Sequence, residues 1–124
     1  MEYVVTPDAP KAIGPYSQAV KANGFLYTSG QIALDPATGN LVDGSFEDQV
    51  HRVFKNLEAV QRAGGGGFDR VLKATVFLTD LANFQALNTI YAQYFGDHKP
   101  ARTTVGVKQL PKDGLVEIDL VALA

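Results

Sequence analysis

The sequence predicts an α+β protein in which two helices pack on one face of a single, mostly antiparallel β-sheet. Segments that alternate apolar and polar residues, as strands do, surround two longer segments whose apolar residues recur at helical spacing. The resulting order is strand, hairpin, helix, strand, helix, strand, strand. The 124 residues are close to the commonest domain size, so we expect one domain over residues 1–124.

The first quarter of the chain predicts a short strand, an irregular loop and a hairpin. Residues 3–6 are typical of a strand, and residues 7–15 hold three prolines and a glycine, which favours a stiff loop. Asn23-Gly24 separates residues 18–22 from residues 25–29. Because both central positions of a tight hairpin turn need φ > 0, this dipeptide predicts that the two segments pair.

A first helix is predicted after Ser45, a residue suited to the N-cap, with Glu47 and Asp48 in the first turn where negative charge is favourable. The run 64–67 consists of four glycines and ends the helix. A phosphate-binding loop is disfavoured, because the run follows a helix and lacks Gly-Lys-Ser/Thr. We expect a left-handed C-cap and a slack linker. The apolar face comprises Phe46, Val50, Val53, Phe54, Leu57 and Val60.

Residues 70–79 predict a long strand, and Asp80 is suited to cap a second helix that Gly96 ends. The apolar stripe of this helix is more typical of a core than of a surface that stacks nucleobases. Asn88 lies one step off the stripe and fits either a core amide or a pocket residue. The stripe of the helix comprises Leu81, Phe84, Leu87, Tyr91 and Tyr94/Phe95. The strand is expected to bury Leu72, Ala74, Val76 and Leu78. The uncovered face of the sheet is expected to carry Thr75 and Phe77 of this strand and Val121 of the last strand.

Residues 101–107 predict a strand with a β-branched face and a face that carries Arg102, Thr104 and Gly106. A planar guanidinium beside a bare glycine suits the floor of an anion site, since it can hold a carboxylate with two parallel hydrogen bonds. A solvated arginine on an edge strand is the plain alternative. Residues 115–123 predict the last strand, with Glu117 on its polar side.

Composition excludes several classes of protein. The net charge is −2 and the charges are scattered, so the basic footprint of a nucleic-acid-binding protein is missing. The absence of cysteine excludes disulfides and thiolate chemistry. No apolar segment approaches the ~18 residues that span a membrane, and the first residues lack the pattern of a signal peptide. We therefore expect a cytoplasmic protein that contacts neither membrane nor nucleic acid.

The candidate chemistry follows by elimination. His51 and His98 make a poor metal cluster, so no metal is expected. No Gly-x-Ser-x-Gly motif supports a Ser-His-Asp triad. Glu117 and Asp119 could be the paired carboxylates of a glycosidase, but the sequence around them has no feature that favours this role. What remains suits a small anionic substrate attacked by water. The remaining groups are Arg102, the hydroxyls of Tyr16, Ser29 and Thr104, the backbone amide of Gly30 and the carboxylate of Glu117.

Five motifs together resemble the RidA (YjgF-type) family of imine deaminases over residues 2–123. Each motif alone is modest, but their order and spacing are specific. The motifs are Gly14-Pro-Tyr-Ser-Gln18, Thr28-Ser-Gly-Gln-Ile32, Phe84…Asn88…Tyr91, Pro100-Ala-Arg-Thr-Thr-Val105 and Leu110-Pro-Lys…Val116-Glu-Ile-Asp119.

The resemblance implies a chorismate-mutase-like fold, a homotrimer with sites between subunits, and no cofactor. The implied reaction is hydrolysis of 2-imino acids, such as 2-iminobutanoate and 2-iminopropanoate, to 2-oxo acids and ammonia. These reactive imines leave PLP-dependent dehydratases and can damage PLP enzymes. A metabolite-binding regulatory protein that recognises 2-oxo acids, a translation-inhibiting endoribonuclease and a chaperone-like surface role are the alternatives.

The resemblance also implies roles for individual residues. Arg102 would hold the substrate carboxylate, Glu117 would orient or activate water, and Tyr16, Ser29, Gly30, Asn88 and Thr104 would line the pocket. Many relatives have cysteine at position 104, so the threonine here argues against thiol chemistry.

The last two strands lead to a hypothesis about assembly. If residues 101–109 and 115–123 form a hairpin, Glu117 pairs near Lys108, six residues or about 20 Å of strand from Arg102. One small substrate could not then reach both groups of one chain. We therefore expect a complete site to combine Arg102 of one subunit with Glu117 of a neighbour.

Overall fold

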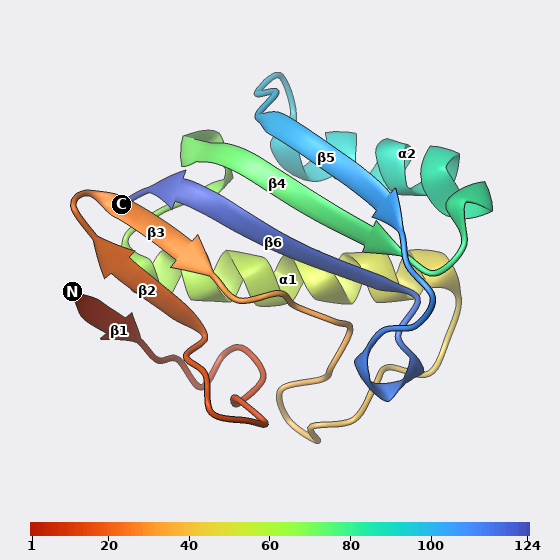
Figure 1. Ribbon diagram of the computed structural model, residues 1–124, viewed down its shortest axis with the longest axis horizontal. Helices are drawn as coiled ribbons and strands as arrows, with labels where there is room; N and C mark the ends of the chain where they lie inside the picture. Colours follow the sequence, from red (N-terminus) through yellow and green to blue (C-terminus); the bar gives the residue numbers. More distant parts are fainter.

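The computed structural model describes all residues 1–124 as a six-stranded sheet with two helices on one face (Figure 1). The strand order is β1-β2-β3-β6-β4-β5, and every pair is antiparallel except β4 with β5. This is the predicted fold class. The strands are β1 Glu2–Val4, β2 Ala19–Ala22, β3 Phe25–Thr28, β4 Val71–Leu78, β5 Ala101–Gly106 and β6 Val116–Leu123, and the helices are α1 Phe46–Gly64 and α2 Phe84–Phe95.

The predicted hairpin is confirmed as β2–β3, in which Ala22 pairs with Phe25. Asn23 and Gly24 both have positive φ, 53° and 82°, as the tight turn requires. Both chain ends lie beside this turn, because Glu2 pairs with Lys21 and Leu123 pairs with Phe25. The N and C labels of Figure 1 accordingly stand at one end of the sheet.

The α1 helix begins as predicted. The Ser45 side chain accepts a hydrogen bond from the Asp48 N–H, and the Asp48 carboxylate accepts one from the Ser45 N–H. This capping box satisfies two backbone donors that a helix start otherwise leaves free. Phe46, Val50, Val53, Phe54, Leu57 and Val60 are all buried and form the centre of the core against the sheet.

The glycine run at the end of α1 is a close-packed segment and not a slack linker. Gly65 is the left-handed C-cap, with φ of 85°. A Cβ added at Gly64 would lie 2.7 Å from a methyl carbon of Leu26 on β3. Glycine at position 64 therefore lets the helix end lie directly on the sheet.

Three expectations about the second half of the chain need correction. Leu72 is 42% exposed and Val71 is buried in its place, because a bulge at this point of β4 shifts the alternation. Asp80 caps a single 3-10 turn, Leu81–Asn83, and α2 itself begins at Phe84. Leu81 and Phe84 are exposed, so Leu87, Ile90 and Phe95 are the side chains that α2 buries.

The predicted hairpin between residues 101–109 and 115–123 is wrong. The chain runs from β4 through α2 into β5, and this crossover places β5 parallel to β4 at the edge of the sheet. The following strand, β6, inserts between β3 and β4 and pairs antiparallel with both. Alternation in a strand shows which residues share a face, but it does not identify the neighbouring strand. On β5 it also does not identify the covered face, because the β-branched side that includes Val105 is exposed and the Arg102 side lies toward α2.

Replacing Ser45 with alanine should lower the free energy of unfolding by about 1 kcal/mol, because the Asp48 N–H loses its acceptor. Ser45→Thr keeps an oxygen at this position and is the control. Urea unfolding followed by circular dichroism measures the difference, and equal stability of the alanine and threonine variants would contradict the capping role.

Candidate functional site

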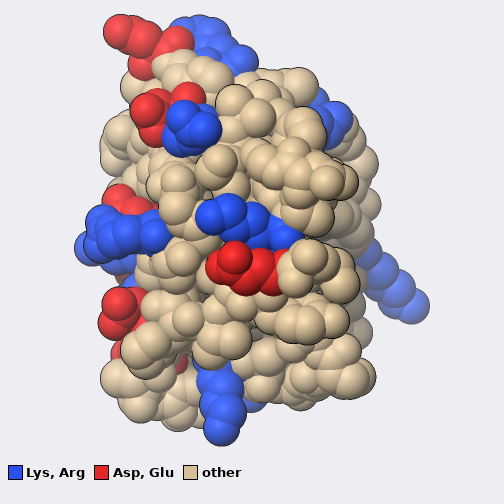
Figure 2. All heavy atoms as spheres, turned by 90° about the vertical axis from the view of Figure 1, so that its left-hand side faces the viewer, with Lys and Arg blue, Asp and Glu red and all other residues tan.

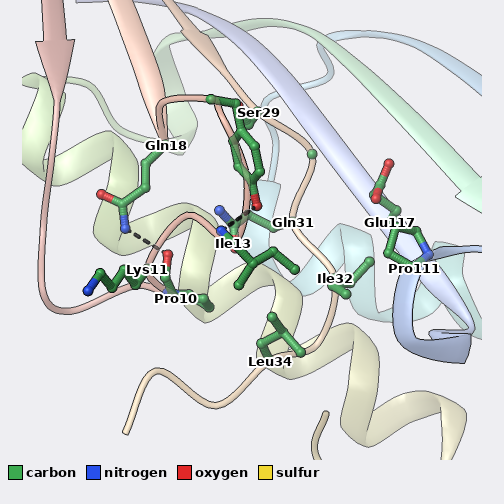
Figure 3. Close-up of a pocket in the computed structure, with 12 residues that line it drawn as sticks. Pro10, Lys11, Ile13, Gln18, Ser29, Gln31, Ile32, Leu34, Pro111 and Glu117 are labelled. Atoms are coloured by element: carbon green, nitrogen blue, oxygen red, sulfur yellow. Dashed lines mark hydrogen bonds between the residues drawn. The ribbon is translucent and has the colours of Figure 1, made fainter. Parts of the chain in front are cut away.

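A hollow of about 440 Å³ lies where the loop before β2, the segment after β3 and the start of β6 meet (Figure 3). Four of the residues singled out in the sequence line it together: Tyr16, Ser29, Gly30 and Glu117. In Figure 3, Glu117 and Pro111 lie across the opening from Gln18, Pro10 and Lys11. The sequence did not indicate the largely apolar remainder of the wall, which includes Pro10, Ile13, Ile32, Leu34 and Pro111.

Gln18, which the sequence interpretation did not single out as a site residue, holds the loop wall of the hollow in place. Its buried amide oxygen accepts a hydrogen bond from the Thr6 N–H at 2.7 Å, and its amide nitrogen donates to the carbonyls of Thr6, Ala9 and Pro10. A proline-rich loop cannot satisfy all its own carbonyls, so a buried amide at its end replaces the missing backbone donors. The sequence offered one signal for this role, which is a glutamine directly between a proline-rich loop and an apolar strand.

Gly30 brings the backbone against Glu117. A Cβ built on Gly30 would lie 2.8 Å from the Glu117 carboxyl carbon, so any side chain here would displace the carboxylate. The N–H of Gly30 makes no backbone hydrogen bond, whereas the N–H groups of both its neighbours do. Ser29 donates its hydroxyl hydrogen to the Ser17 carbonyl, which ties this segment to the loop.

The surroundings of Glu117 shift the pKa of its carboxyl upward from its ordinary value. Burial raises the pKa of the Glu117 carboxyl, and the nearby Asp119 charge raises it further. Burial also raises the pKa of Asp119, although a hydrogen bond with Thr75 opposes this rise. A carboxyl whose pKa moves toward neutral is suited to accept and return a proton during a reaction.

Arg102 lies on the opposite face of the sheet, toward α2. Its guanidinium carbon is 4.8 Å from the centroid of the Tyr91 ring and 5.5 Å from that of Phe84. Asn88 lies one helical turn after Phe84 on the same side of α2. The buried hydroxyl of Thr104, two residues after Arg102 on β5, has no hydrogen-bond partner in the chain. Arg102, Asn88 and Thr104 thus belong to a second group of predicted residues.

One chain does not bring the two groups together. Arg102 pairs with Ala74 of β4, and Glu117 pairs with Phe77 of the same strand, so they differ by three residues along β4 and by two strands across it. That is roughly 10 Å in each direction. Ala74 is buried on the helix side, whereas Phe77 lies on the open face. Arg102 borders a separate hollow of about 210 Å³ with Tyr91 and Lys99.

The physical reason for this separation differs from the one expected. The distance expected from the hairpin does not apply, because β5 and β6 are not neighbours. The two side chains are separated because they leave the sheet on opposite faces.

Features expected of other kinds of binding site were also sought in the structure. On the face shown in Figure 2, acidic and basic side chains are interspersed and no continuous basic stripe is present. No three His, Asp or Glu side chains lie close enough to hold a metal ion. No helix has the length and apolar character needed to cross a membrane.

Comparison with known proteins identifies the family. Residues 6–124 match the family model described as Endoribonuclease L-PSP. Reactive Intermediate Deaminase A, chloroplastic, of Arabidopsis thaliana is 46% identical over 121 residues, which cover 98% of this chain and 65% of that protein. The chain belongs to this family, which is the RidA (YjgF-type) family that its motifs resemble.

Solved structures agree closely with the fold. The crystal structure of RidA from an Antarctic Psychrobacter is 40% identical, with a TM-score of 0.96, and covers 100% of both chains. A crystal structure of E. coli TdcF with bound serine is 38% identical, with a TM-score of 0.94, and covers 100% of this chain and 99% of that one.

Replacing Glu117 with glutamine should stabilise the fold at neutral pH. Because the folded state raises the pKa of Glu117, ionisation of this carboxyl costs stability once the pH exceeds its unfolded value. The variant lacks that cost at pH 7, and the difference should vanish below about pH 4, where both states bind the proton. Thermal unfolding at the two pH values measures the effect, with the exposed Glu2→Gln as control. If the wild-type protein is more stable than Glu117→Gln at pH 7, the pKa of Glu117 is not raised in the folded state.

Proposed function

We propose that this protein hydrolyses 2-imino acids to 2-oxo acids and ammonia, with 2-iminobutanoate and 2-iminopropanoate as substrates. The observation that carries the proposal is the Glu117 carboxyl, which lies at the edge of a largely apolar hollow against a bare glycine, with its pKa raised by burial. The name of the Arabidopsis relative and the serine in the TdcF structure support an amino-acid-like ligand.

Each reacting group has an assigned task in this proposal. Arg102 binds the substrate carboxylate through two parallel hydrogen bonds. Glu117 accepts a proton from water as the water oxygen bonds to the imine carbon. Glu117 returns this proton to the substrate nitrogen, which gives an intermediate that carries a hydroxyl and an amine on one carbon. The hydroxyl proton then passes through Glu117 to the nitrogen as the carbon–nitrogen bond breaks, so that ammonia leaves and the 2-oxo acid remains. An imine carbon is already electrophilic, so the typical ~10²–10⁴-fold contribution of acid–base catalysis, together with orientation, supports turnover without a cofactor.

The complete site is proposed to form between copies of the chain in a homotrimer. The open face of the sheet carries Tyr27, Phe77 and Val121 beside Glu117 and Asp119, so it is partly apolar and without a covering layer. Such a face favours association. A neighbouring copy would bring its Arg102, with Asn88 and Thr104, to the hollow that contains Tyr16, Ser29, Gly30 and Glu117.

The physiological role proposed is removal of reactive imines before they damage PLP enzymes, in the cytoplasm. A regulatory protein that only binds 2-oxo acids would use the same pocket, and an imine-hydrolysis assay separates the two. The family description favours an endoribonuclease as a second candidate. The net charge of −2 and the interspersed surface charges are unfavourable for RNA binding.

Arg102→Ala should abolish hydrolysis of 2-iminobutanoate, because the substrate carboxylate loses its partner. Glu117→Gln should lower kcat more than it raises KM, since it removes proton transfer and retains the side-chain shape. A threonine dehydratase generates the imine in the assay, and release of 2-oxobutanoate and ammonia is followed. Arg62→Ala, at an exposed arginine on α1, is the control. An unchanged rate in Arg102→Ala would discard the assignment.

Mixing the two impaired variants tests the shared site directly. If Arg102 and Glu117 act from different subunits, trimers reassembled from equal amounts of Arg102→Ala and Glu117→Gln contain intact sites. Random assembly makes about a quarter of the sites intact, since each partner is intact in half of the cases. Recovery of about that fraction of wild-type activity is expected. No recovery in mixed trimers that mass spectrometry has verified would place both groups in one chain.

A further inference from the structure

The Arg102 guanidinium lies against aromatic rings and has no acidic partner. Tyr91 and Phe84 both place a ring centroid within the roughly 6 Å over which an aromatic face attracts a cation. The one ion pair in the chain joins Arg62 to Glu58. The arginines that donate side-chain hydrogen bonds are Arg52 and Arg70. The N–H groups of Arg102 are therefore free.

The α2 helix sets the position of both rings. Phe84 and Tyr91 are seven residues apart, two helical turns, so they project from the same side of α2. The Tyr91 ring is fixed in turn by Phe95, at 4.4 Å between centroids, and by Phe54 of α1, at 5.9 Å. The surface that contacts Arg102 is thus continuous with the rigid core.

An aromatic support and a carboxylate support would have different consequences for an arginine. A carboxylate would occupy two of the five N–H donors and neutralise the charge. A ring face contacts the flat side of the guanidinium, so the donors at its rim remain available. We propose that Phe84 and Tyr91 are positioning residues that hold the Arg102 fork in place with its charge and donors free for an incoming carboxylate. This inference rests on the proposed function for the identity of the ligand.

The ring of Tyr91, and not its hydroxyl, carries this role. The hydroxyl is buried and has no hydrogen-bond partner in the chain. Tyr91→Phe therefore retains the support and serves as the conservative variant, whereas Tyr91→Leu removes the π face. Phe84 is 39% exposed, so Phe84→Leu removes the second ring with little risk to the core.

Steady-state kinetics with 2-iminobutanoate and calorimetric binding of 2-oxobutanoate test the proposal. Phe84→Leu and Tyr91→Leu should each raise KM and Kd roughly three- to thirtyfold, the range that cation–π energies convert to, and leave kcat within about twofold. Tyr91→Phe should behave like the wild type. Gln85→Ala, an exposed position on α2, is the control.

A second measurement is independent of any ligand. In the wild type, ring currents should displace the NMR signal of the Arg102 side-chain N–H groups, identified by its loss in Arg102→Lys. Phe84→Leu should return the signal toward the ordinary arginine position, and this variant is informative even if Tyr91→Leu fails to fold.

The outcomes separate the two proposals. Unchanged KM and an unchanged NMR signal in Phe84→Leu would overturn the positioning role, as would equal defects in Tyr91→Phe and Tyr91→Leu. If Arg102→Ala binds 2-oxobutanoate normally, the proposed function fails, and the displaced NMR signal still decides whether the rings hold the arginine.

Discussion

The two-residue period of a β-strand is the constraint on which the rest of this structure depends. It gives β6 one face that packs against α1 and another that presents Glu117 and Asp119. It also directs Arg102 of β5 toward α2. The cation and the carboxyl group that the proposed chemistry requires are therefore carried by opposite faces of one sheet, and under that proposal each chain supplies two separate parts of a site.

The open face shows a conflict between stability and the proposed chemistry. Burial disfavours the ionised forms of Glu117 and Asp119, and the charge of Asp119 adds to this effect at Glu117. Such local conflicts concentrate at functional sites, because catalysis needs groups that packing alone would not select. The buried, hydrogen-bonded Gln18 has the opposite character, since its polar atoms strengthen the loop they lie against.

Much of the fold could be predicted from local signals. The Asn23-Gly24 turn, the Ser45 cap and the helix end at Gly96 each depend on residues next to one another, and all three were predicted correctly. The strand neighbours of β5 and β6 were not predicted correctly, because they depend on which strand fills the space between β3 and β4. The bulge that exposes Leu72 also has no local signature.

The same distinction between local and long-range signals applies to the residues of the candidate site. Residues in continuous motifs, such as Tyr16, Ser29 and Gly30, were recognised and lie around one hollow with Glu117. Gln18 belongs to one of the motifs, but its role could not be predicted, because its partners are backbone carbonyls that any sequence would supply. The relation of Arg102 to the hollow could not be predicted from the sequence pattern, since the face on which a strand residue lies depends on the sheet as a whole.

The two chain ends beside the β2–β3 turn have a practical consequence. Glu117 lies near the start of β6 and Leu123 at its end, about 20 Å of strand away. Affinity tags, fluorophores or surface linkers attached to either terminus therefore project from the end of the sheet remote from the hollow. The protein can be immobilised through its ends with that opening left uncovered.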